Sequence, residues 1–204
     1  TGTSIESLEY YAYYPYTSSN ITGTVISSSL NTVQSAPFDS SQDVMVSDIL
    51  NSSYNETTPA SLHFSFKQHL FAVIRIDITN TIDSLKDDKI ESVIIKADDA
   101  TLTGDYNFDI ADGQNAVPSF ISNTSNKVTL LYPNDAQPVV GLNSPHTIYA
   151  IVNECTISKI TVTINTNNHL GQVASTFALP INIERSAVNR MKSIDLADAK
   201  MKRK

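Results

Sequence analysis

Cysteine, glycine and charged residues are scarce in this chain, and each scarcity excludes a class of site or partner. Cys155 is the only cysteine among the 204 residues, so a disulfide framework and a cysteine-based metal site are both excluded. The six glycines lie too far apart to form a glycine-rich phosphate-binding loop. No stretch approaches 18 consecutive apolar residues, which excludes a transmembrane helix within the sequence shown.

Positive charge is missing from the first third of the chain, where no lysine or arginine precedes Lys67. The net charge of −7 repels phosphate backbones and anionic lipid, so nucleic acid is not expected as a partner. Half of the 14 basic residues fall near the other end: Arg185, Arg190, Lys192, Lys200, Lys202, Arg203 and Lys204. We expect an acidic lobe with a solvated basic tail. Head-to-tail electrostatic complementarity between copies is the alternative.

Strict alternation of apolar and polar residues is the strongest signal that is present. Between Leu62 and Thr79 the even positions are apolar except Gln68, namely Leu62, Phe64, Phe66, Leu70, Ala72, Ile74, Ile76 and Ile78. A period of two predicts a strand with one buried face. At roughly 3.3 Å per residue the run exceeds a usual strand, so we expect a bulge or a change of sheet near Lys67 to His69.

Further strands are predicted along most of the chain. Regular alternation covers residues 101–110, 159–164 and 177–184, and less regular candidates cover 8–14, 21–27, 90–97, 127–132, 147–152 and 192–196. About ten strands separated by Asn, Asp, Gly and Pro clusters predict an all-β sandwich architecture. The pattern is weakest around residues 113–126, where we expect a linker between an N-terminal lobe (1–112) and a C-terminal lobe (127–204). A single continuous sandwich is the alternative.

Residues able to carry chemistry do not form a recognisable site. His63 and His69 lie six positions apart, on one face of an unbroken strand, yet no third metal ligand follows at a characteristic spacing. The pairs Asp87–Asp88 and Asp98–Asp99 lie in turn-like contexts that do not separate the pKa values of two carboxylates. We therefore expect no catalysis, no cofactor and no metal. A hydrolase on a β-sandwich scaffold would need His63, His69 and a carboxylate to converge on one pocket.

A tyrosine cluster near the N-terminus has two interpretations. Tyr10, Tyr13 and Tyr16 are candidates for stacking on a sugar, which would make the protein a secreted glycan-binding β-sandwich module. Tyrosine is also a favoured strand residue, so the same side chains could pack against the core. The absence of tryptophan from the whole chain favours packing.

The order of several segments resembles a known family. Tyr11 to Tyr16, Asp43 to Leu50 and the run Leu62 to Thr79 are followed by Ile90 to Asp109, which contains Leu102-Thr103-Gly104-Asp105-Tyr106. Together with the closing region Ile160 to Leu196, this order is similar to the fimbrillin-like proteins of Bacteroidetes, the type V pilin subunits. The resemblance covers most of the chain, and its motifs are structural rather than catalytic.

That resemblance implies two transthyretin-like Greek-key β-sandwich lobes and a structural or adhesive subunit of a fimbria at the outer membrane. It also implies a lipid anchor outside the residues shown, and assembly with other pilin subunits by β-strand exchange after a leading strand is removed. Host or bacterial surface ligands would be further partners. The exchange groove would be walled by Leu62, Phe64 and Phe66, or by Ile74, Ile76 and Ile78.

Three features depart from the family pattern. The lipoprotein cysteine and the leading strand do not precede Thr1, so the N-terminal lobe is expected to lack its first strand. The first arginine, Arg75, lies inside a predicted strand, where an activating protease would not reach it. The basic tail after Asp198 does not have the apolar pattern of a donor strand.

Overall fold

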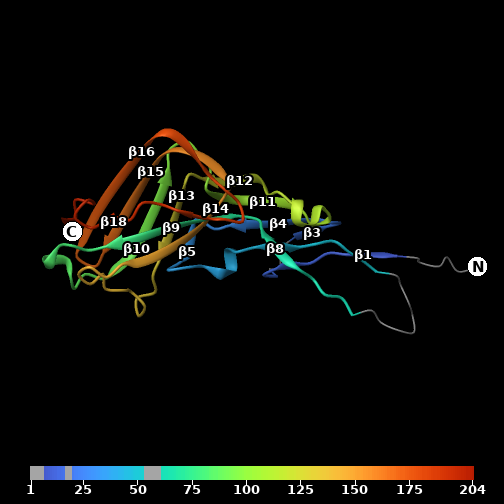
Figure 1. Ribbon diagram of the computed structural model, residues 1–204, viewed down its shortest axis with the longest axis horizontal. Coiled ribbons are helices and arrows are strands. Elements are labelled where there is room, and N and C mark those ends of the chain that lie inside the picture. Colours follow the sequence, from blue (N-terminus) through green and yellow to red (C-terminus); the bar gives the residue numbers. More distant parts are fainter. Residues whose placement is uncertain (1–6, 17–19, 53–60) are drawn as a thin grey trace, which may run out of the picture.

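The computed structural model describes residues 7–16, 20–52 and 61–204, and it is almost entirely β (Figure 1). Within these ranges, three short 3₁₀ helices accompany the strands: η1 (Ser40–Gln42), η2 (Asp83–Leu85) and η3 (Ile110–Asn115). The strands are β1 (Leu8–Tyr10), β2 (Tyr13–Tyr14), β3 (Asn20–Thr22), β4 (Val25–Leu30), β5 (Val33–Ser35), β6 (Met45–Ser47), β7 (Leu50–Ser52), β8 (Phe66–His69), β9 (Ala72–Thr79), β10 (Ile90–Ala97), β11 (Thr103–Asp109), β12 (Ser119–Ser125), β13 (Lys127–Leu131), β14 (His146–Val152), β15 (Cys155–Thr166), β16 (His169–Ile183), β17 (Val188–Arg190), β18 (Ile194–Asp195) and β19 (Lys202–Arg203). The all-β prediction is confirmed. Within these described ranges no helix is long and apolar enough to span a membrane.

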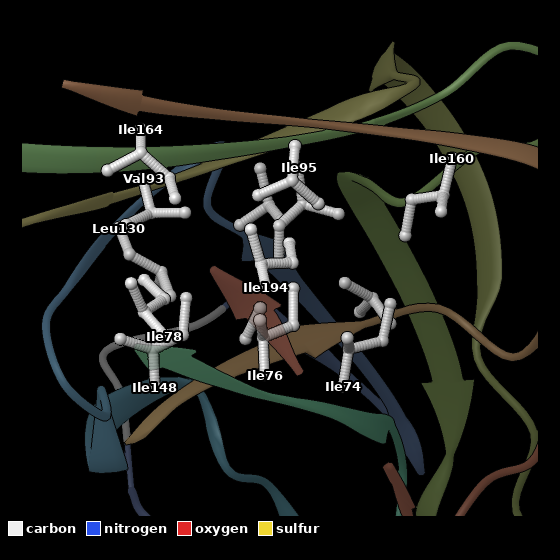
Figure 2. Packing of buried hydrophobic residues seen from close by; sticks show 14 of the residues in the cluster. Ile74, Ile76, Ile78, Val93, Ile95, Leu130, Ile148, Ile160, Ile164 and Ile194 are labelled. Atoms are coloured by element: carbon white, nitrogen blue, oxygen red, sulfur yellow. The ribbon is translucent and has the colours of Figure 1, made fainter. Parts of the chain in front are cut away.

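The larger core lies between two sheets. One sheet has six strands in the order β19-β16-β15-β10-β13-β5, and the other has the order β14-β9-β17, with β18 also pairing with β9. Alternate residues of each strand point into the space between the sheets, as a period of two requires. Figure 2 shows Val93, Ile95 and Ile164 facing Ile76 and Ile78 across this space. We call this cluster the first core.

A second core lies beside the first. It is enclosed by the four-stranded sheet β12-β11-β4-β3 and the three-stranded sheet β2-β6-β8. Aromatic rings contact one another within it, since Phe71 packs edge-to-face on Tyr106 at 4.9 Å between ring centroids and Tyr106 stacks on Phe108 at 6.2 Å. In Figure 1 the two cores follow one another along the long axis, with β1 near one end and the C-terminus at the other.

Strands β9 and β14 contribute to both cores. Ile74 and Ala150 face the first core, whereas the neighbouring Val73 and Ile151 contact the second. Successive side chains of a strand point to opposite faces, so this sheet is covered on both sides. The two cores therefore share one wall.

The long apolar run from Leu62 is divided between two sheets, as expected, and the division follows directly after the predicted range of Lys67 to His69. β8 continues through His69, which pairs with Met45 of β6, and β9 begins at Ala72 beside β14. Leu70 and Phe71 form the bend, and both are buried in the second core. The bulge expected near Lys67 to His69 is confirmed, because the pairing of β8 with β6 shifts register between Phe66 and Gln68.

The two parts of the chain that were expected to form separate lobes are interleaved. Residues 113–126, expected as a linker, contain the end of η3 and all of β12, which pairs with β11. β10 precedes this segment, yet it lies between β13 and β15, which both follow it. The six-stranded sheet is thus built from both sides of the expected division.

Candidate functional site

The two sets of groove candidates lie in different environments. Ile74, Ile76 and Ile78 are completely buried in the first core, where they face the six-stranded sheet (Figure 2). Leu62 and Phe64 are partly exposed in a segment without strand structure, and Phe66, which begins β8, is 37% exposed. Only Leu62, Phe64 and Phe66 are accessible to another molecule without opening the first core.

The outer edge of β8 runs beside this accessible set. β8 ends the order β2-β6-β8, so among the described residues no strand pairs with its other side. Ser186 covers its C-terminal end, because the His69 backbone N–H donates to Ser186 Oγ at 2.6 Å and that hydroxyl donates to the His69 carbonyl at 3.2 Å. Phe66 to Gln68 are left with an open edge, to which an added strand can bond.

A cavity of about 360 Å³ opens next to His69. Phe38 and Tyr149 meet edge-to-face in its wall, with 6.2 Å between ring centroids. His69 Nδ1 lies 2.6 Å from Asp43 Oδ1, which fixes the imidazole at the same wall. The rest of the lining is Phe71, Val73, Ser186, Ala187 and Val188. Sequence reasoning did not find this cavity, because its lining comes from four distant parts of the chain.

Only some of the tyrosine candidates are exposed enough to contact a sugar. Tyr13 packs edge-to-face against Phe108 at 6.0 Å, so it belongs to the edge of the second core, and Tyr10 is partly buried in β1. Tyr16 is 74% exposed and its ring lies 6.2 Å from that of Tyr13. Tyr14, which was not a candidate, is also exposed. The cluster therefore serves packing through Tyr13 and presents Tyr16 outward.

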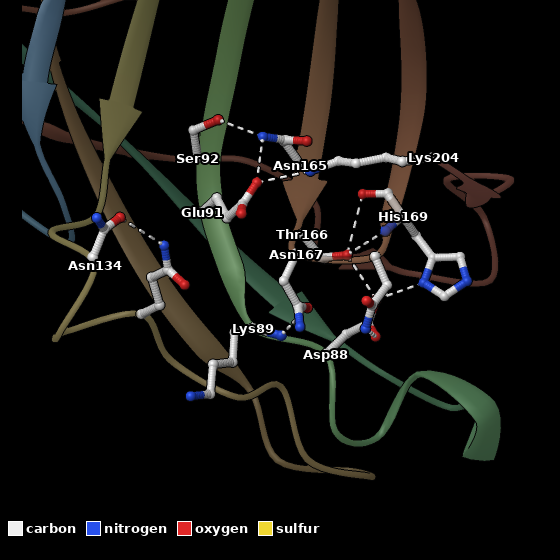
Figure 3. Close-up of polar contacts among 12 residues, drawn as sticks. Asp88, Lys89, Glu91, Ser92, Asn134, Asn165, Thr166, Asn167, His169 and Lys204 are labelled. Atoms are coloured by element: carbon white, nitrogen blue, oxygen red, sulfur yellow. Dashed lines mark hydrogen bonds and ion pairs between the residues drawn. The ribbon is translucent and has the colours of Figure 1, made fainter.

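A buried carboxylate organises the turn between β15 and β16. Asp88 is 4% exposed and accepts hydrogen bonds from Thr166 Oγ1 at 2.6 Å and Asn168 Nδ2 at 2.9 Å, and His169 Nδ1 lies 2.6 Å from it (Figure 3). Burial raises the pKa of Asp88, but these hydrogen bonds outweigh burial and hold that pKa below its ordinary value. The cluster fixes a turn, since Thr166, Asn168 and His169 all direct a polar atom at the Asp88 carboxylate.

The other residues considered for chemistry are separately engaged. His63 contacts Ser61, whereas His69 contacts Asp43, so the structure does not bring the two histidines together. Hydrogen bonds from Lys159 and Lys96 hold the pKa of Asp98 below its ordinary value. Burial raises the pKa of the Cys155 thiol to about 11, which keeps it protonated and unreactive near neutral pH. Within the described residues, no group of three or more His, Cys, Asp or Glu side chains has the geometry to hold a metal ion.

Comparisons with known proteins identify relatives by fold alone. No protein-family model and no curated protein matches the chain. A crystal structure of a Bacteroides ovatus protein provisionally assigned to cell adhesion aligns with 97% of this chain and 66% of its own length, at 14% identity and a TM-score of 0.60. A second such protein, from Bacteroides uniformis, aligns with 98% of this chain and 72% of its own length, at 14% identity and a TM-score of 0.58.

This chain spans about two thirds of the length of the first of these proteins. A fimbrial protein from Bacteroides vulgatus aligns with 95% of this chain at 13% identity, with a TM-score of 0.45. At these identities the first two alignments show a shared fold, which extends over almost the whole of this chain.

Proposed function

We propose that this chain is a non-catalytic structural or adhesive subunit at the cell surface, which joins other subunits of a fimbria by β-strand exchange. The observation that carries the proposal is the accessible apolar run of Leu62, Phe64 and Phe66 beside the open edge of β8. The fold shared with proteins provisionally assigned to cell adhesion supports it.

The physical basis is simultaneous pairing and burial. A donor strand that adds to β8 gains backbone hydrogen bonds along the open edge and covers the apolar side chains beside it. These side chains are already partly buried, so completing their burial contributes less than the roughly 1.5 to 3 kcal/mol that each would give from full exposure. The backbone hydrogen bonds formed along the edge add to this gain, so the joint would be long-lived.

The same proposal extends to fold and location. The two cores are the counterparts of the two transthyretin-like Greek-key lobes that the family resemblance implies. The subunit is held at the outer membrane by a lipid anchor outside these residues, and its partners are other pilin subunits and surface ligands of host or bacterial cells.

Subunit assembly can be tested with a substitution at each accessible groove position. Purified precursor is trimmed by proteases and examined for ladders that resist detergent on electrophoresis. We expect ladders from the trimmed wild-type chain and none from Phe64→Asp or Phe66→Asp, because a carboxylate cannot be buried beneath the donor strand. Ile121→Asp is the matched control, since Ile121 is also exposed, on β12, away from this edge. If precursor and trimmed chain both stay monomeric under every processing condition, the polymerising role is wrong.

Glycan binding is the second candidate, and the exposed ring of Tyr16 is the observation that favours it. An exposed aromatic face can stack on a sugar, and the neighbouring Tyr13 ring would form one side of such a platform. Binding on a glycan array that is lost in Tyr16→Ala, but retained in Tyr149→Ala, would support this function. An array without any bound glycan would reject it.

A further inference from the structure

Strand β16 forms one edge of the six-stranded sheet, and most of that edge is open. β19 pairs only with His169 and Leu170, and the Gln172 backbone N–H donates to the Ala199 carbonyl at 2.7 Å. Beyond Gln172, no strand in the described part of the chain lies on the outer side of β16. The pairing with β15 is regular up to Thr176 and is interrupted between Thr176 and Ile181. Val173 to Thr176 therefore form the regular part of the open edge.

The regular part of this edge lacks the charge, proline and bulge that usually protect an edge strand. The fifteen residues of β16 include no aspartate, glutamate, lysine or arginine, and Pro180 lies beyond Thr176, where the pairing with β15 is interrupted. An uncharged edge with unpaired backbone groups is a template for another strand. Val173 and Phe177 are only partly buried against the first core, so apolar surface borders the open backbone groups. These features indicate a surface that another strand covers.

We propose that two copies of this chain associate through their β16 strands, which pair antiparallel about a two-fold axis at Ser175. A chain of net charge −7 repels a second copy, so contact is favoured where charge is absent, and β16 is such a place. Ser175 lies between Ala174 and Thr176 in the regular part of this edge. Two-fold symmetry then brings Val173 of each copy to the same end as Phe177 of the other, so that a β-branched and an aromatic side chain approach each other.

The backbone groups of the open segment fit this register. Because the Gln172 N–H points outward, the N–H and C=O groups of Ala174 and Thr176 point outward as well in a regular strand. Ala174 of one copy faces Thr176 of the other, so these two residues exchange a pair of hydrogen bonds on each side of the axis. Ser175 faces Ser175 in a position without hydrogen bonds, where the side chains approach most closely.

Charge at the two ends of β16 is complementary in the antiparallel orientation. Lys200 and Lys202 lie near the beginning of the strand, whereas the exposed Glu154 and Glu184 lie near its end. Each end of one copy approaches the opposite end of the other. Added salt should therefore weaken the association.

Sedimentation equilibrium of the full chain at several concentrations tests the dimer. We expect a reversible monomer–dimer equilibrium, and Ser175→Lys should raise its dissociation constant at least about tenfold, because two like charges would face each other across the axis. Ser119→Lys is the control, since Ser119 is also an exposed residue of an edge strand, β12, and should leave the constant unchanged. A wild-type chain that is monomeric throughout, or a dimer insensitive to Ser175→Lys, overturns the proposal.

Disulfide cross-linking tests the register without introducing a charged side chain. In a Cys155→Ser background, Ser175→Cys should form a reducible covalent dimer under mild oxidation, because the Cα separation of a non-hydrogen-bonded pair is within the range of a disulfide. Ser119→Cys should react far more slowly. Equal rates at the two positions would indicate random collision and overturn the register.

The test of the β16 dimer is independent of the test of strand exchange. The β16 dimer requires no proteolytic trimming and dissociates on dilution, whereas an exchanged-strand ladder requires trimming and resists detergent. Either result can fail while the other succeeds.

Discussion

At the scale of single residues, the Gln34 side chain bonds to the outer edge of β14 in the way a neighbouring strand would. β14 is the outermost strand of its sheet, yet Ile151 of β14 has both backbone groups bonded, since Gln34 Nε2 donates to its carbonyl at 2.7 Å and its N–H donates to Gln34 Oε1 at 3.0 Å. Gln34 is 1% exposed, so these bonds are shielded from water. One amide side chain therefore supplies both hydrogen bonds that a neighbouring strand would give to Ile151.

Replacing Gln34 with alanine should lower the free energy of unfolding by about 2 to 4 kcal/mol. The reason is that a buried N–H and a buried C=O would both lose their partner. Urea denaturation with an unchanged m-value is the measurement. Gln137→Ala is the control, because the hydrogen bond of Gln137 to Asn134 is exposed and its loss should cost less than about 0.5 kcal/mol. Equal effects of the two substitutions would contradict this account.

Asp88 should make stability fall in acid. Its pKa is lowered in the folded chain, so the stabilisation is complete above the ordinary carboxyl pKa of about 4 and is lost as pH falls through the folded value. At pH 7, Asp88→Asn should cost about 1.5 to 3 kcal/mol, as for hydrogen bonds to a charged group, and the deficit should shrink below about pH 4. Urea denaturation as a function of pH measures it.

Asp83→Asn is the control for this pH dependence. Asp83 pairs only with the exposed Lys86, at 3.4 Å, and both side chains are largely solvated. Its substitution should leave the pH profile unchanged. A deficit for Asp88→Asn that stays constant down to pH 2 would exclude the assigned role.

None of these residue pairings was predictable from the sequence. Gln34 and Ile151 are 117 positions apart, and Asp88 and His169 are 81 apart. Local patterns report which face of a strand is buried, but they do not report which distant backbone group a polar side chain will meet. The cavity beside His69 was missed for the same reason.

At the scale of elements, the run from Leu62 to Thr79 shows what alternation does and does not determine. The period of two correctly predicted strands and a change of sheet. It also suggested one apolar face of uniform burial, whereas Ile76 is completely buried and Phe66 is not. Burial depends on which sheet covers each half, and that follows from long-range pairing rather than from the alternation itself.

Truncating Ile76 and Phe66 should show that the two halves of the run differ in their contribution to stability. Ile76→Ala should lower the free energy of unfolding by about 2 to 5 kcal/mol, because it leaves a cavity in the first core. Phe66→Ala removes more atoms but should cost less than about 1 kcal/mol, since the ring is already partly solvated. Chemical denaturation of both variants measures the two losses in the free energy of unfolding. A larger loss for Phe66→Ala would mean that β8 is covered more completely than described.

At the scale of the whole molecule, the shared wall of β9 and β14 couples the two cores. Neither core can lose this sheet without exposing apolar residues of the other, because Ile74 and Ile151 lie on its opposite faces. Such coupling favours joint unfolding over separate unfolding of two lobes.

Thermal unfolding should accordingly show one transition. Ile76→Ala in the first core and Phe108→Ala in the second should each lower the same midpoint, and calorimetric and van't Hoff enthalpies should agree. Tyrosine fluorescence and far-ultraviolet circular dichroism should give coincident curves. Two resolved transitions, each moved by only one of the substitutions, would show that the cores unfold independently.

The parallel pairing of β9 with β17 and β18 also has a mechanical consequence. β9 runs roughly along the long axis (Figure 1), and β18 pairs parallel to its C-terminal end, where Ile78 meets Ile194. Tension that draws the start of β9 and the end of β18 apart slides these strands along each other, so their hydrogen bonds are loaded together instead of one at a time. Stretching single molecules between the start of β9 and the end of β18 should therefore require more force than peeling β16 from β15, whose antiparallel hairpin opens bond by bond.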